Sequence, residues 1–194
     1  MLTKLAMEIT SFFCAHEMLN AEKYDWYVYA IEKKLVSRMG LLSMLLFGTV
    51  ISDFFSTGTF IAGFYILRSW AGGYHASSFA RCLALSVFTV FFNASFVTPL
   101  FLTSAQGATV VAAIIASVIV FALGSVDTPN YQVSTAEVRK RDMATRILIS
   151  GQLSIAVLLL SFASTKLYGV SLTSGMCFVA ISSIVGKIKE ENGK

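Results

Sequence analysis

The chain consists of long apolar runs separated by short clusters of charged residues. A membrane-spanning helix needs about 20 mostly apolar residues, and four runs meet this length: residues 83–102, 107–126, 147–165 and 167–186. Residues 82–138 contain no Lys or Arg. A cation at the centre of a bilayer costs about 3 kcal/mol, whereas a soluble core has no reason to exclude charge over such lengths. The pattern therefore predicts an all-α membrane protein.

The stretch 41–67 is 27 residues long and carries Asp53 near its middle. Basic residues lie on both sides of it, namely Lys33, Lys34 and Arg38 before it and Arg68 and Arg81 after it. Because basic flanks favour the cytoplasm, both ends belong on the same side of the membrane. We therefore predict a hairpin of two short helices with Asp53 near the outer water. This gives six apolar membrane segments with both termini cytoplasmic.

The first 38 residues have a different pattern. Apolar side chains recur at helical spacing, with charged residues opposite them; the apolar face comprises Tyr24, Tyr27, Val28, Ile31 and Leu35. This pattern is typical of an amphipathic helix lying on the inner leaflet, although an ordinary helix packed on the other segments would show it too. We divide the chain into an interfacial segment, 1–38, and a membrane domain, 39–194.

Composition agrees with a membrane setting. The chain is 56% hydrophobic and 13% charged, whereas soluble domains carry roughly 25% charged residues. The net charge of +4 comes mostly from clusters beside apolar runs, which indicates contact with membrane lipids rather than nucleic acid. The three cysteines, Cys14, Cys82 and Cys177, are too few and too scattered for a disulfide framework.

The familiar motifs of membrane enzymes are missing from the sequence. His16-Glu17 lacks the second histidine of a zinc-binding HExxH motif. The sequence contains no GxSxG motif, no glycine-rich phosphate loop and no pair of aspartates within the apolar runs. We therefore expect neither a metal nor a cofactor. One dense cluster of polar and small residues is left, between Arg68 and Cys82.

Within this cluster, His75 and Cys82 could form a nucleophile and base pair. A thiol has a pKa near 8.5 and needs a base or a favourable local potential to attack a peptide bond. On one unbroken helix, residues seven apart would have Cα atoms about 10.5 Å apart, too far for a direct hydrogen bond. A working pair therefore requires His75 to lie outside the helix that carries Cys82.

The sequence allows that arrangement. Gly72-Gly73 permits a sharp turn, and Ser77 or Ser78 can cap the following helix. Cys82 would then lie in the first turn, where the helix dipole and Arg81 favour a thiolate. The spacing also fits a plain structural interpretation, because a single Cys among apolar residues usually just packs.

The pattern Arg68-x-x-x-Gly72-Gly73-Tyr74-His75-Ala76-x₅-Cys82 resembles the accessory gene regulator B (AgrB) family. These proteins are membrane cysteine endopeptidases of Gram-positive peptide quorum sensing. The stretch Val126-Asp127-x-Pro129-Asn130 resembles a second family motif. The chain departs from the family around that motif, with Gly124-Ser125 before it and Tyr131-Gln132 after it.

The resemblance implies a mechanism and a set of site residues. Cys82 would be the nucleophile and His75 its general base, with Arg68, Gly72 and Gly73 in supporting roles. The substrate and partner would be an AgrD-like precursor peptide, cut through a thioester that leads to a cyclic thiolactone or lactone. The resemblance also implies a homodimer in the bacterial cell membrane, with the catalytic site on the cytoplasmic side.

A late basic cluster adds a candidate substrate site. Arg139, Lys140 and Arg141 precede an apolar run, with Arg146 close behind. Family precursors carry an acidic C-terminal tail, so we hypothesise that this cluster binds the tail. Such clusters also fix topology and bind anionic lipids, at about 1 kcal/mol per residue.

Two other classes of function fit the sequence. A non-enzymatic peptide transporter or export channel would use intramembrane polar residues such as Asn93 and Gln152. A membrane scaffold would use the basic cluster at 139–146 to bind acidic partners. Neither class would need the thiol of Cys82.

Overall fold

The computed structural model describes residues 2–16, 18–73, 79–125 and 135–192, and this part of the chain is almost entirely helical. The elements run in the order α1 (Leu2–Ala15), η1 (Ala21–Lys23), α2 (Tyr24–Ile51), α3 (Phe54–Ile61), η2 (Ala62–Ile66), α4 (Leu67–Ala71), α5 (Phe79–Phe92), η3 (Asn93–Val97), α6 (Thr98–Thr103), α7 (Gln106–Leu123), α8 (Thr135–Ser161), η4 (Ala163–Thr165) and α9 (Lys166–Asn192). The predicted all-α class is confirmed for these residues.

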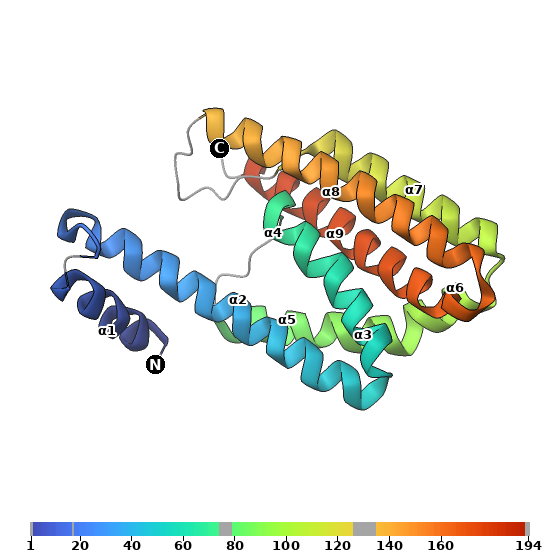
Figure 1. The fold of residues 1–194 in the computed structure, drawn as a ribbon, viewed down its shortest axis with the longest axis horizontal. Helices are drawn as coiled ribbons and strands as arrows, with labels where there is room; N and C mark the ends of the chain where they lie inside the picture. Colours follow the sequence, from blue (N-terminus) through green and yellow to red (C-terminus); the bar gives the residue numbers. More distant parts are fainter. Residues whose placement is uncertain (1, 17, 74–78, 126–134, 193–194) are drawn as a thin grey trace.

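Helix α9 lies at the centre of the helix bundle, between the α3–α4 run on one side and α7 and α8 on the other (Figure 1). In its most apolar 18-residue stretch 67% of the residues are buried, against 17–28% in the other four long apolar helices. Many buried positions of α9 hold small residues, among them Ser171, Thr173, Ser174 and Ala180. Small side chains allow neighbouring helices to approach closely where lipid provides no hydrophobic driving force between them.

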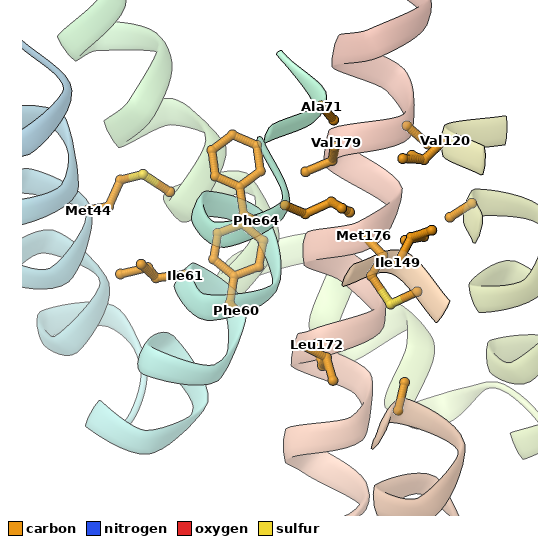
Figure 2. Packing of buried hydrophobic residues seen from close by; sticks show 14 of the residues in the cluster. Met44, Phe60, Ile61, Phe64, Ala71, Val120, Ile149, Leu172, Met176 and Val179 are labelled. Atoms are coloured by element: carbon orange, nitrogen blue, oxygen red, sulfur yellow. The ribbon is translucent and has the colours of Figure 1, made fainter. Parts of the chain in front are cut away.

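Close packing between α9 and the α3–α4 run forms one part of the core, to which α2, α5, α7 and α8 also contribute buried side chains (Figure 2). A Cβ added to Gly175 would lie 2.8 Å from the carbonyl oxygen of Phe60 and 2.9 Å from the amide nitrogen of Phe64. A Cβ on Gly63 would lie 3.0 Å from the carbonyl oxygen of Leu172. The two helices therefore meet backbone to backbone. The rings of Phe60 and Phe64, two of the residues at this contact, stack with their centroids 6.0 Å apart.

Two short π-helical segments interrupt the regular helices. The segment η2 joins α3 directly to α4, and η3 joins α5 directly to α6. Each junction leaves a continuous helical run, over 54–71 in the first case and 79–103 in the second. Segments of this kind are rare and occur frequently at functional sites. The first one leads into the five-residue helix that carries Arg68.

Five helices are long and apolar enough to cross a membrane: Tyr24–Ile51, Ala80–Thr103, Gln106–Leu123, Ala136–Ser161 and Ala163–Lys189. Large apolar side chains are exposed along them, including Val50, Leu100 and Val118, as expected for surfaces that face lipid. The run 54–71 is not among the five. It contains Arg68 and several hydroxyl side chains, which lower its mean hydropathy.

The first helices differ in form from the expected hairpin of two short helices. Helix α2 continues without a break through residue 38, so the last part of the predicted interfacial segment, residues 24–38, and the first part of the stretch 41–67 form one helix of 28 residues. The chain turns at Ser52 and Asp53, whose carboxylate accepts a hydrogen bond from the Ser56 amide at 2.9 Å. A helix of this length can keep its charged first turns outside the membrane and still cross it, because 20 residues span about 30 Å. The number of crossings and the side of the termini stay predictions.

Candidate functional site

The glycine pair at the end of α4 makes a turn that other residues would strain. Gly72 has φ 73° and Gly73 has φ 112°, both in the region that side chains with a Cβ rarely adopt. The Gly72 amide donates to the carbonyl oxygen of Arg68 at 3.0 Å and so closes the helix. The sharp turn predicted for Gly72-Gly73 is present.

Gly73 is also in close contact with α9. A Cβ at this position would lie 2.8 Å from the Ser182 hydroxyl oxygen and 3.1 Å from the Ser182 carbonyl oxygen. The residue therefore meets two independent constraints, the positive φ and the absence of space. Any larger side chain would push the end of α4 away from the central helix.

Arg68 projects from α4 toward the same part of α9. Its Nη1 donates to the Ser182 hydroxyl at 2.6 Å, and its Cζ lies 5.4 Å from the centre of the Phe64 ring. The guanidinium is partly buried; burial lowers the pKa of Arg68, and a negative charge on Cys82 would act in the opposite direction. Arg68 and Cys82 lie on two different helices, α4 and α5.

Cys82 is the fourth residue of α5, so it lies in the first turn, as the sequence predicted. Its side chain is partly buried and forms no disulfide. The Ser86 hydroxyl donates to the Cys82 carbonyl oxygen at 3.0 Å, so this hydrogen bond uses the backbone of Cys82 and not its thiol.

His75 lies outside the described residues, as do the cap candidates Ser77 and Ser78 and the motif at 126–130. Gly73 and Phe79 mark the described ends on either side of the histidine segment. The pairing of His75 with Cys82 therefore stays a prediction. Within the described part of the chain, no group of three or more His, Cys, Asp and Glu side chains could hold a metal ion.

The basic cluster lies at the start of α8, opposite α4. Lys140 and Arg141, together with Glu137, line an open cleft of about 480 Å³, and Ser69 and Trp70 line its other side. Arg139 is exposed and does not line the cleft. The cleft therefore places two of the three predicted basic residues directly beside the helix that carries Arg68.

A further positive charge lies near this cleft. Lys33 of α2 is within electrostatic range of Arg141, and the two cations repel one another. Like charges held close together favour a bound anion, because an anion relieves the repulsion. Sequence analysis used Lys33 as a charged residue of the first segment and as a basic flank of the stretch 41–67, and its proximity to Arg141 follows from the tertiary fold.

Sequence analysis also missed Ser182 and Asp142. Asp142 accepts two hydrogen bonds from Ser125, from its amide and its hydroxyl, both at 2.7 Å. This contact ties the end of α7 to α8, close to the basic cluster. It uses the Gly124-Ser125 pair. Gly124 has a positive φ of 64°, and a Cβ there would lie 2.9 Å from a carboxylate oxygen of Asp142.

The intramembrane polar residues Asn93 and Gln152 are both buried. The amide oxygen of each has no hydrogen-bond partner among the described residues. Asn93 lines a cavity of about 10 Å³, with Ser56 and Thr57 among the other lining residues. A cavity of this size holds about one water molecule, and it is too small to conduct a peptide.

Comparison with known proteins identifies the family. The model of the family "AgrB: Accessory gene regulator B" matches residues 6–184 of the 194-residue chain. No curated protein and no solved structure matches the chain. The match covers the basic cluster, the glycine turn, Arg68 and Cys82. The chain therefore belongs to the accessory gene regulator B family.

Proposed function

We propose that the chain is a membrane cysteine endopeptidase that removes the C-terminal tail of an AgrD-like precursor peptide. Membership of the AgrB family implies involvement in the maturation of quorum-sensing peptides. The observation that supports the chemistry best is the position of Cys82. The thiol lies in the first turn of α5, within electrostatic range of the Arg68 guanidinium. The start of a helix is a place where the dipole favours negative charge, and the thiolate is the reactive form of a cysteine.

The reaction would proceed in two steps. The Cys82 sulfur attacks the carbonyl carbon of the scissile peptide bond, and His75 takes the thiol proton and passes it to the departing amine. The C–N bond breaks, the tail leaves, and a thioester joins Cys82 to the shortened peptide. A thiol or hydroxyl of the bound peptide then attacks the thioester and closes the ring, which returns the Cys82 thiol. Backbone amides at the start of α5 are candidates to stabilise the oxyanion.

Substitution of the two reacting residues tests this proposal. Cys82→Ala and His75→Ala should each abolish tail removal while leaving membrane insertion intact, because neither residue anchors a membrane segment. Cys14→Ser and Cys177→Ala are matched controls and should retain cleavage, since these thiols have no part in the reaction. The measurement is conversion of a tagged precursor by the full chain in membranes. Normal conversion by the Cys82→Ala variant would refute the proposed cysteine-protease activity.

We place the catalytic site on the cytoplasmic side of the membrane. The basic residues of the site, Arg68, Lys140 and Arg141, support this orientation, because cytoplasmic ends of membrane segments carry an excess of Lys and Arg. A thiol reagent that cannot cross the membrane should then label Cys82 in inverted vesicles and not in sealed cells. Labelling from the outer face of sealed cells would contradict the orientation.

The open cleft between α4 and α8 supports a binding site for the acidic tail of the precursor. Lys140 and Arg141 line one side, and the exposed ring of Trp70 lines the other. Lys33 adds positive charge from a third helix. The tail would bind here while Cys82 attacks the peptide bond upstream of it. Because the site is open, its attraction for carboxylates should weaken as salt is added.

Charge reversal at individual positions tests the cleft. Lys140→Glu and Arg141→Glu should each raise KM for the precursor about tenfold, which corresponds to a loss of about 1.4 kcal/mol, and lysines placed in the tail should partly restore it. Arg139→Glu is the matched control: it makes the same change one residue away, outside the cleft, and should raise KM much less. Equal effects at all three positions would show that the cluster is only a topology signal. The measurement is initial cleavage rate against precursor concentration.

A second function, peptide transport without cleavage, rests on the buried amides of Asn93 and Gln152. The cavity beside Asn93 is the size of one water molecule. This favours a local hydration site over a peptide route. The experiment on Cys82 also separates the two functions, because a transporter would tolerate loss of the thiol.

A further inference from the structure

The open cleft between α4 and α8 has two walls of different character. Lys140 and Arg141 lie on the α8 wall, and the Trp70 indole lies on the α4 wall. We infer that Trp70 is a specificity-determining residue and that the cleft accepts an amphipathic acidic peptide, with carboxylates toward α8 and an apolar side chain against the indole. The inference rests on the proposed function and names the class of tail that this site takes.

Trp70 presents a large apolar surface that the chain itself leaves uncovered. Helix α4 buries Leu67 and Ala71 completely, whereas 38% of Trp70 is exposed, and Trp70 lines the cleft. Ser69 lines the same wall, but its hydroxyl donates to the Ile66 carbonyl oxygen at 2.7 Å. A rigid aromatic ring offers a large contact area at a low cost in conformational entropy. The α4 wall is therefore suited to an apolar side chain.

The facing wall carries charge of both signs. Lys140 and Arg141 supply two cations, and Glu137 supplies a carboxylate one helical turn before them. Residues three and four apart lie on the same face of a helix, which places these side chains along one wall. The cations outnumber the carboxylate, so the wall attracts an anion, but Glu137 opposes a ligand with dense negative charge. Carboxylates that are spaced apart fit this wall better than a continuous run of them.

The size of the cleft allows a peptide to contact both walls. The volume is about 480 Å³, and a water molecule takes about 30 Å³ of liquid, so there is room for several side chains. Successive side chains of an extended peptide point to opposite sides. A carboxylate that faces α8 therefore has neighbours in the sequence that face α4. An acidic residue next to an apolar residue satisfies both walls at once.

An aromatic ring beside basic residues also fits lipid headgroups, because Trp and cations both gather at the membrane surface. The place of Trp70 in the chain favours a peptide. Trp70 is two residues before Gly72, where the glycine turn begins, and His75 lies between that turn and Cys82 in the sequence. A peptide held against Trp70 is thus bound to the helix from which the candidate catalytic segment begins.

Fluorescence of Trp70 measures occupation of the cleft without any cleavage. The chain has two tryptophans, so Trp26→Phe leaves Trp70 as the remaining indole, and Cys82→Ala removes the proposed nucleophile. The probe is an eight-residue peptide in which Glu and Leu alternate, added to this full chain in a neutral detergent. Its leucines should cover the indole and shift the emission to shorter wavelength in a saturable way. A titration without a saturable shift would overturn the inference.

Two further peptides of the same length separate the effect of charge from that of apolar contact. A peptide of alternating Glu and Ser keeps the carboxylates and should bind about tenfold more weakly, because it buries no apolar side chain on Trp70. A peptide of alternating Lys and Leu keeps the leucines and should cause no saturable shift, because Lys140 and Arg141 repel it. Equal binding of the Glu–Leu and Glu–Ser peptides would overturn the role of Trp70. Equal binding of the Glu–Leu and Lys–Leu peptides would overturn the choice of an acidic ligand.

The same fluorescence signal tests lipid as the occupant. In the absence of peptide, the emission of Trp70 should be the same in membranes of phosphatidylcholine and in membranes that also contain phosphatidylglycerol. A shift caused by phosphatidylglycerol alone and lost in Lys140→Glu would identify an anionic headgroup in the cleft. That result would overturn the peptide as its ligand.

Cleavage kinetics test whether the indole contacts the tail of the precursor. Trp70→Ala should raise KM about tenfold and leave kcat near its wild-type value, because the ring holds the tail and does not touch the reacting atoms. Trp70→Phe keeps an aromatic ring and should raise KM much less. Trp26→Ala is the matched control: Trp26 is 41% exposed and lies outside the cleft, so its loss should leave KM unchanged. Equal effects of Trp70→Ala and Trp26→Ala would reduce Trp70 to a membrane-surface residue and overturn the inference.

Changes in the tail show whether the contact is direct. Replacement of the apolar residues of the tail by Ser should raise KM for the wild-type chain and cause little further rise in Trp70→Ala. Independent, additive effects would contradict a direct contact. If Trp70→Ala does not fold, the fluorescence titrations, which use the natural Trp70, still decide the question.

The two kinds of measurement separate this inference from the proposed function. Binding of the Glu–Leu peptide by a chain that cuts no precursor would contradict only the protease. Cleavage of precursor with an unchanged KM in the folded Trp70→Ala variant would contradict only the role of Trp70.

Discussion

The contact between the end of α4 and the central helix α9 is the constraint on which the candidate site depends. Gly73 lies against Ser182 with no room for a Cβ, and Gly63 and Gly175 bring the same two helices together at the other end of the contact. Such close approach lets backbones pack tightly in a lipid environment, where burial of apolar surface gives little preference for helix association. The α3–α4 run is thereby fixed along most of its length. Arg68 and the glycine turn lie at the end of this run and are held in place with it.

This arrangement places a cation where a charge would otherwise be costly. A partly buried guanidinium needs acceptors and counter-charge, because burying an unpaired charge is strongly unfavourable. Ser182 supplies an acceptor and Phe64 an aromatic ring. The cleft of Lys140 and Arg141 adds a second positive region on the far side of α4, suited to an acidic part of the same peptide.

The helical class and the position of Cys82 could be predicted from sequence, because both depend on local signals. Charge-free runs mark membrane helices, and a glycine pair followed by serines marks a turn and a new helix start. The continuity of α2 through residue 38 could not be predicted in this way. Charged residues such as Lys33 and Arg38 suggest a boundary, yet they can extend beyond the membrane on the same helix. The contacts of Ser182 and Lys33 depend on which helices pack together, and hydrophobic periodicity does not determine helix neighbours. The density of small residues in α9 was the one available signal that this helix is central.

The central claim is that Cys82 carries the peptide as a thioester. The most direct measurement is the intact mass of the enzyme after brief incubation with precursor, before and after hydroxylamine at neutral pH. The account predicts an adduct whose mass equals the enzyme plus the precursor without its tail. Hydroxylamine should remove it, because thioesters react with hydroxylamine and amides do not. An adduct that resists hydroxylamine, or one that forms equally on the Cys82→Ala chain, would contradict the account.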